Sequence, residues 1–144
     1  MLNQKKSLTL SLVFFLVIFC GVLGYYSLRS HKQVTDDGLV IEDLVVGNGA
    51  ETTKGKTISF NYTGSLLKNH KQFDSSYDRG VSYTVEVGVG HAIPAWDKGI
   101  VGMKIGGKRR LTVPASLGYG EKGAGTVVPP NSDLVYEIEL ISIK

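Results

Sequence analysis

The chain has 144 residues, 42% of them hydrophobic and 20% charged, and this length favours a single folded domain. The net charge of +3 comes from residues 1–32, which hold four basic residues and no acidic one and leave 12 basic and 13 acidic residues in 33–144. We therefore expect no nucleic-acid partner for the globular part. A single cysteine, Cys20, excludes an internal disulfide, and with only three histidines we expect no metal site.

The N-terminal segment predicts a membrane anchor or an export signal over residues 1–29. Residues 7–28 form an uncharged run of 22 positions, and a helix of that length would reach about 33 Å, enough for a hydrocarbon core of about 30 Å. Lys5 and Lys6 precede the run and favour a cytoplasmic N-terminus with the domain across the membrane. The alternatives are a cleaved signal peptide, which would give a secreted or periplasmic domain, and a lipoprotein attached at Cys20.

The remaining residues predict a linker followed by an antiparallel sheet. Residues 30–38 are polar and lack periodicity, which predicts a linker before a domain over residues 39–144. Half-buried strands, which alternate apolar and polar residues, are predicted over 57–63, 83–87, 108–113 and 134–143, and more weakly over 40–46. In 134–143 the alternation fails because Ser142 falls on the apolar face, which a β-bulge or a second buried contact would explain.

One short helix is predicted, over residues 93–101. Pro94 suits its first turn, and Ile93, Trp96 and Ile100 then share one side. A short helix packed against an antiparallel sheet predicts an α+β fold, preceded by the hydrophobic helix of the N-terminal segment.

Three local patterns are rejected as functional motifs. Residues 118–123 match G-x-G-x-x-G, but no helical pattern follows, so we expect no dinucleotide site. Residues 108–110 (KRR) would divide between the two faces of a strand, and we interpret them as a solvated edge. His70 lies in a polar, hairpin-like stretch, where a solvated loop histidine is expected.

Aromatic residues and one carboxylate remain as candidates for a site. Tyrosine and tryptophan carry polar groups that need partners when they are buried, and Asp74 directly follows Phe73. Six motifs in chain order then resemble the FKBP-type peptidyl-prolyl isomerases, a resemblance that covers residues 40–144. They are YTG (62–64), FDSSYDR (73–79), Ile93 with Trp96, GYG (118–120), VVPPN (127–131) and LVYEIEL (134–140).

The resemblance implies a half-barrel, in which a strongly twisted antiparallel sheet wraps around the short helix with the site between them. It implies that Trp96 is the floor under a substrate proline ring, and that the Ile93 amide and Tyr119 hydroxyl hold substrate carbonyls. The implied catalytic residues are Asp74, which is expected to bond to Tyr62 and Arg79, together with Tyr62 and Tyr119. The implied substrate-binding residues are Tyr62, Phe73, Asp74, Arg79, Tyr83, His91, Ala92, Ile93, Trp96, Tyr119, Val127, Val128 and Tyr136.

The activity that the resemblance implies is rotation of X–Pro bonds in proline-containing polypeptides, with rapamycin-class macrolides as a further ligand class. Rotation faces a barrier of about 20 kcal/mol, because resonance makes the peptide bond partly double. An apolar pocket favours the twisted, less polar state, so no nucleophile, metal or cofactor is required. A non-catalytic module that holds proline segments or acts as a chaperone is the alternative. His91 and Ala92, on the expected rim, depart from the common family pattern.

Overall fold

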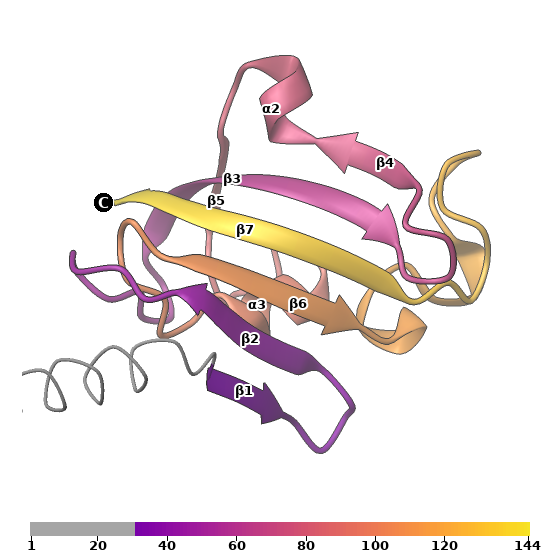
Figure 1. Ribbon diagram of the computed structural model, residues 1–144, viewed down its shortest axis with the longest axis horizontal. Helices are drawn as coiled ribbons and strands as arrows, with labels where there is room; N and C mark the ends of the chain where they lie inside the picture. Colours follow the sequence, from indigo (N-terminus) through magenta and orange to yellow (C-terminus); the bar gives the residue numbers. More distant parts are fainter. Residues whose placement is uncertain (1–30) are drawn as a thin grey trace, which may run out of the picture. The chain divides into compact units, whose positions relative to one another are not determined.

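The two longest strands, β3 (Thr57–Leu66) and β7 (Leu134–Ile143), lie side by side at the centre of a seven-stranded sheet (Figure 1). The computed structural model describes residues 31–144. The strand order is β1-β2-β6-β7-β3-β4, with β5 also paired to β3, and every pairing is antiparallel. The remaining strands are β1 (His31–Val34), β2 (Val40–Val45), β4 (Gln72–Ser75), β5 (Tyr83–Glu86) and β6 (Lys108–Val113).

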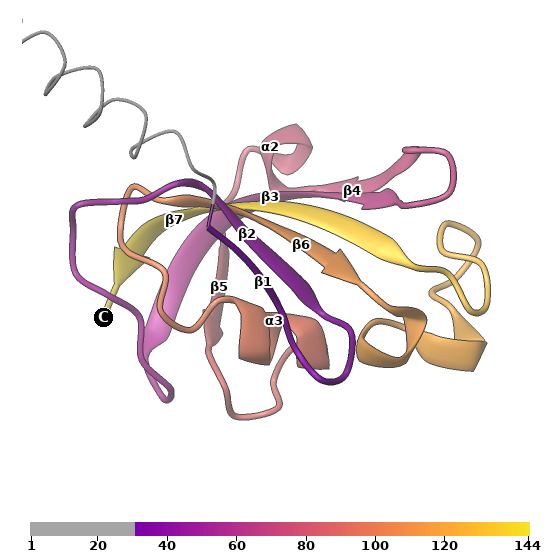
Figure 2. The same ribbon diagram turned by 60° about the horizontal axis from the view of Figure 1, so that its bottom comes forward.

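The helical segments are all short. They are α2 (Ser76–Arg79), α3 (Pro94–Gly99) and the 3₁₀ turns η1 (Ala115–Leu117) and η2 (Gly120–Lys122). Figure 2 shows α3 under one face of the twisted sheet. The antiparallel sheet with a short helix that the sequence predicts is therefore confirmed, although α2 shows that residues 93–101 are not the only helical segment, as the sequence analysis supposed.

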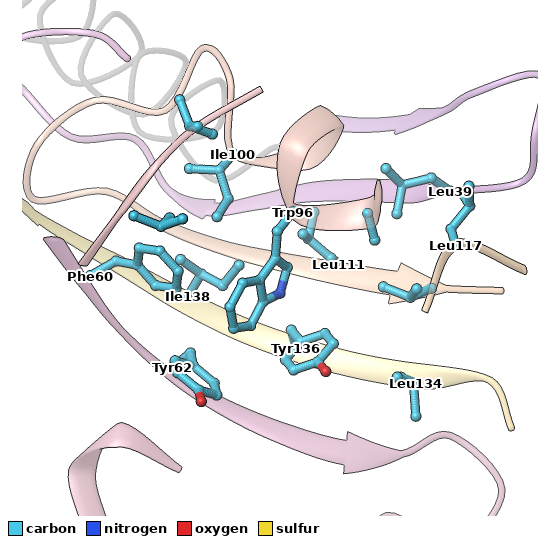
Figure 3. Close-up of a cluster of buried hydrophobic side chains, with 14 of the residues drawn as sticks. Leu39, Phe60, Tyr62, Trp96, Ile100, Leu111, Leu117, Leu134, Tyr136 and Ile138 are labelled. Carbon is cyan, nitrogen blue, oxygen red and sulfur yellow. The ribbon is translucent and has the colours of Figure 1, made fainter. Parts of the chain in front are cut away.

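The core fills the space between α3 and the sheet. Along β3, every second residue is buried, beginning with Ile58, Phe60 and Tyr62, as the alternation predicts. Helix α3 packs closely on β6. Gly99 permits this approach, since a β-carbon there would lie only 2.7 Å from both methyl carbons of Leu111. Trp96 on α3 is thereby held against the buried face of the sheet, in the middle of the core (Figure 3).

The linker predicted for residues 30–38 is wrong in its boundaries. Residues 31–34 form β1, which pairs with β2 from His31↔Asp43 to Val34↔Val40, and the compact unit begins at His31. All four residues of β1 are exposed, so this edge strand has no apolar alternation by which the sequence could have predicted it. The predicted N-terminal helix lies outside the described residues. Within residues 31–144, no helix combines the length and apolar character needed to span a membrane.

Two irregular positions are explained by the pairing. The register between β3 and β7 shifts between Ser59 and Phe60, which leaves Ile141 as the extra residue of a bulge and explains why the alternation fails at Ser142.

The solvated edge expected at residues 108–110 is wrong, because β6 lies between β2 and β7 and Arg109 is buried. Hydrophobic periodicity does not reveal that the Arg109 side chain is buried and bonded to Asp43 and to the Gly99 carbonyl.

Candidate active site

Trp96 lies at the centre of a cluster of aromatic rings. Its ring centroid is 4.9 Å from that of Tyr62, 5.1 Å from Tyr136, 5.2 Å from Phe60 and 5.4 Å from Tyr83, and all four contacts are edge-to-face. This is the favourable arrangement for aromatic pairs. The indole is 7% exposed, and its Nε1 has no hydrogen-bond partner among residues 31–144. We call Phe60, Tyr62, Phe73, Tyr83, Trp96, Tyr119 and Tyr136 the aromatic cluster.

Helix α3 is anchored at both ends, and this fixes the indole. At its start, the Ile93 carbonyl accepts from the Trp96 and Asp97 amides at 2.9 and 3.3 Å, and Pro94 occupies the first turn. At its other end, Arg109 Nη1 donates to the carbonyls of Gly99, the last residue of α3, and of Val101, at 2.8 and 3.0 Å. A cation at a helix C-terminus also opposes the negative end of the helix dipole.

Phe73, Tyr119 and Tyr136 form the outer part of the aromatic cluster. The Phe73 centroid is 5.9 Å from that of Tyr136 and 6.5 Å from that of Tyr119. Tyr136 is buried, whereas Phe73 and Tyr119 are only partly buried. Burial, and secondarily the nearby Tyr119, raises the pKa of the Tyr136 hydroxyl well above its ordinary value. The Tyr136 hydroxyl therefore remains neutral at physiological pH.

Asp74, Tyr62 and Arg79 form a closed hydrogen-bonded triangle beside these rings. The Tyr62 hydroxyl donates to Asp74 Oδ2 at 2.5 Å, Arg79 Nη2 donates to the Tyr62 oxygen at 2.9 Å, and Arg79 Nη1 bonds to Asp74 Oδ1. The Arg79 guanidinium carbon also lies 5.6 Å from the Tyr62 ring centroid, within cation–π range. The contacts implied for Asp74 are thus present, while its catalytic role stays a prediction.

Local structure explains why these three residues meet. β4 pairs with β3 so that Asp74 lies opposite Gly64, and α2 follows at once and carries Arg79 in its last turn. The Tyr62 amide donates to Ser76 Oγ at 2.9 Å, which ties the start of α2 to β3. Two strands and a single helical turn therefore place the triangle.

The triangle sets the charge of its members. Partial burial alone would raise the pKa of Asp74, but hydrogen bonds from Tyr62 and Arg79 outweigh it, and the pKa is lowered. Burial, and then the Asp74 hydrogen bond, raises the pKa of Tyr62 to about 12, against the opposing effect of Arg79. Asp74 is consequently a carboxylate and Tyr62 a neutral donor throughout the physiological range.

The loop between β5 and α3 carries three more of the predicted substrate-binding residues. His91 is exposed, and Ala92 and Ile93 are partly buried. Among the backbone hydrogen bonds of residues 31–144, none is donated by the Ile93 amide. The loop is held by Asp97, whose two carboxylate oxygens accept from the Gly88 and Gly90 amides at 2.8 and 2.7 Å.

The loop between β6 and β7 carries Tyr119, Val127 and Val128. The Ala124 amide donates to the Val128 carbonyl at 2.9 Å, so the loop folds back on itself. Val128 is 1% exposed and belongs to the core, whereas Val127 is 51% exposed. The structure therefore does not place the two valines alike, although the family resemblance implies that both bind substrate.

Two residues with structural roles at the site were missed by sequence reasoning. Asp97 braces the β5–α3 loop, and nothing in its sequence neighbourhood predicts the two amides that it accepts from. Gly64 lies so close to Phe73 and Tyr136 that a side chain there would displace one of these rings. Gly64 was part of the YTG motif, but no role was given to it. Residues 31–144 contain no group of three or more His, Cys, Asp and Glu side chains placed to bind one metal ion.

Comparison with known proteins identifies the family to which this fold belongs. Residues 49–141 match the family model described as FKBP-type peptidyl-prolyl cis-trans isomerase. An FK506-binding protein of Neisseria meningitidis serogroup B is 52% identical over 106 residues, which cover 74% of this chain and 96% of that protein. The chain belongs to the FKBP-type peptidyl-prolyl cis-trans isomerase family.

Other FKBP relatives agree in both sequence and structure. The peptidyl-prolyl cis-trans isomerase FPR2 of Saccharomyces cerevisiae is 39% identical over 135 residues, 94% of this chain and 93% of the yeast protein. The crystal structure of AtFKBP13 superposes with a TM-score of 0.73 at 42% identity, over 79% of this chain and 99% of that one. FkpA from Escherichia coli gives a TM-score of 0.71 at 33% identity, and the match spans 84% of this chain and 55% of FkpA. The predicted enzyme class is confirmed, and so is the predicted fold of the domain, a twisted antiparallel sheet with a short helix.

Proposed function

We propose that this FKBP-type isomerase is anchored in a membrane through residues 7–28 and catalyses X–Pro rotation in proteins that fold outside the cytoplasm. The uncharged run of 22 residues behind Lys5 and Lys6 supports this location. Release after signal cleavage is the alternative outcome. Proline isomerisation takes about 10–100 s at 25 °C, so an isomerase there would remove a rate limit in folding.

The observation that carries the catalytic proposal is the position of Trp96 among four aromatic rings beside a hydrogen-bonded carboxylate. The proline ring of the substrate would pack on the indole, in surroundings of low polarity. The planar amide is more polar than the twisted one, so these surroundings raise the energy of the ground state relative to the transition state. The reaction needs no bond to be made or broken.

Hydrogen bonds would select the twisted geometry. The Ile93 amide and the Tyr119 hydroxyl are the proposed donors to substrate carbonyls, and the triangle fixes the Asp74 carboxylate at the edge of the cluster. Because the Neisseria relative is named an FK506-binding protein, we extend the proposal to macrolides of the FK506 and rapamycin class.

A protease-free assay of cis-to-trans relaxation on an X–Pro peptide tests the catalytic proposal with the full chain in detergent. Acceleration that rapamycin inhibits and that Trp96→Phe lowers is the expected result. Peptide binding without acceleration would instead favour the non-catalytic module. Flotation of the full chain with lipid vesicles after alkaline washing tests the anchor separately.

A further inference from the structure

We propose that the end of the sheet where β1 begins rests against the lipid surface, through an apolar patch of Leu44, Val45 and Val46. This inference depends on the anchor proposed above but not on the isomerase activity. It makes the domain a peripheral membrane-contacting unit with a fixed orientation, rather than one that moves freely on a tether.

The first observation is the shortness of the tether. Because β1 begins at His31 and the predicted span ends at Leu28, only residues 29 and 30 separate them. Three chain steps reach at most about 11 Å, at up to about 3.6 Å per residue. If residues 7–28 cross the bilayer, the start of β1 must lie within that distance of the end of the span.

The second observation is what else lies at this end of the sheet. His31 pairs with Asp43, so the last residues of β2 lie beside the start of β1. Val45 in turn pairs with Lys108, the first residue of β6, and Lys108 pairs with Glu139 in the second half of β7. Figure 1 shows the start of β1, the end of β2, the start of β6 and the end of β7 along the same side of the sheet. The short tether therefore holds this end of the sheet close to the bilayer.

The third observation is the character of the surface found there. Leu44, Val45 and Val46 are consecutive and are 38%, 48% and 70% exposed. Three adjacent exposed aliphatic residues suit the interface of a membrane better than water.

The charges around the patch suit anionic headgroups. Lys104 lines one small hollow with Val45 and Val46, and Lys108 lines another with Leu44. Both lysines are exposed. Four acids lie nearby: Asp43 is bonded to Arg109, Glu137 to Arg110, Glu139 lies 3.6 Å from Lys108, and Glu51 is the β-bridge partner of Lys104. A basic residue near an anionic surface favours binding to that surface.

This contact would present the active site away from the membrane. β6 runs six residues from Lys108 to Val113, and at about 3.3 Å per residue this carries the chain roughly 20 Å from the patch. The loop that bears Tyr119 follows at the far end of the strand. Substrates would then reach the aromatic cluster from the aqueous side.

The experiment uses the full chain in vesicles, with Cys20→Ser so that a single new cysteine carries an environment-sensitive dye. Val46→Cys places the dye in the patch, and Val81→Cys is the matched control, since Val81 is a valine of similar exposure, 68% against 70%. We expect lipids with brominated tails to quench the dye at position 46 and to leave position 81 unaffected. With phosphatidylglycerol added to phosphatidylcholine, Lys104→Glu should reduce the quenching, whereas Lys122→Glu should not.

Each other outcome overturns the inference in a distinguishable way. Equal or absent quenching at position 46 in protein that floats with the vesicles disproves the docking and leaves the anchor intact. Protein that does not float disproves the anchor and the docking together, while the peptide assay in detergent still reports on the isomerase. Disulfide cross-linking between two chains through position 46, without lipid quenching, would mean that a second copy covers the patch.

Discussion

Gly64 lies directly against Tyr136, because a β-carbon added at Gly64 would come within 2.7 Å of Tyr136 Cε1. The same carbon would be 2.9 Å from Cζ of Phe73. Both rings belong to the aromatic cluster, and neither is the end of a flexible side chain. The absence of a side chain on β3 therefore sets the separation of the two rings.

Gly64→Ala should impair catalysis more than folding. Overpacking of this kind costs about 1–3 kcal/mol, and here the strain falls on Phe73 and on Tyr136, the ring that contacts Trp96. We expect at least a tenfold loss of kcat/KM in the peptide assay, with the domain still folded by circular dichroism. Thr63→Ala, at the neighbouring position of the same strand, should keep near-normal activity. Comparable losses in both variants would contradict the assigned role of Gly64.

Trp96→Phe should lower kcat/KM by about tenfold or more while keeping the fold. The smaller ring loses part of the edge-to-face contacts, whereas Trp96→Ala would cost about 3–5 kcal/mol and endanger folding itself. The chain has one tryptophan, so ligand binding at the floor should also change the intrinsic fluorescence of the wild-type protein. Unchanged fluorescence at saturating rapamycin would place the ligand elsewhere.

Asp74→Asn should lower kcat/KM by about tenfold, since hydrogen bonds to charged groups contribute about 1.5–3 kcal/mol. Its effect on stability should depend on pH. The folded-state pKa of Asp74 is lowered from 3.8, so the carboxylate stabilises the fold above that pH and its contribution is lost as the pH falls through the lower folded-state value. The difference in unfolding free energy between wild type and variant should thus be constant from about pH 5 to 8 and shrink in strong acid.

Urea unfolding at several pH values measures this difference, and Asp36→Asn, which removes an exposed carboxylate from the β1–β2 turn, is the control. A wild-type-to-variant difference that persists unchanged far below pH 3.8 would show that the Asp74 charge does not stabilise the triangle.

Arg109→Ala should destabilise the domain by about 3–5 kcal/mol, because it leaves Asp43 without the partner that now bonds it through Nε at 2.7 Å. It also removes the donor to the Gly99 and Val101 carbonyls at the end of α3, the helix that carries Trp96. Arg110→Ala, which breaks an exposed pair with Glu137, should cost less than about 1 kcal/mol. Chemical denaturation measures both values, and similar costs would contradict the distinction between the buried and the exposed pair.

The sequence predicted most of the regular structure, because strands with one buried face carry a clear alternation. It did not predict β1, which is exposed throughout, or the burial of Arg109, which depends on Asp43, 66 positions away. Family resemblance supplied the residues of the candidate site, and periodicity supplied only the inward face of Tyr62. The structural roles of Gly64 and Asp97 at the site depend on contacts that form only when the chain has folded.

The position of β7 at the centre of the sheet has a consequence for biosynthesis. β7 pairs with β3 and β6, and residues 134–143 are synthesised long after residues 57–66, so one edge of β3 remains unpaired in the nascent chain. Until then the nascent chain holds an unpaired strand edge and the apolar stripe of Ile58, Phe60 and Tyr62, both of which invite aggregation. Sheet closure between segments so distant in sequence is also slow. A protein proposed to assist the folding of others thus depends, during its own synthesis, on protection of β3 until β7 emerges.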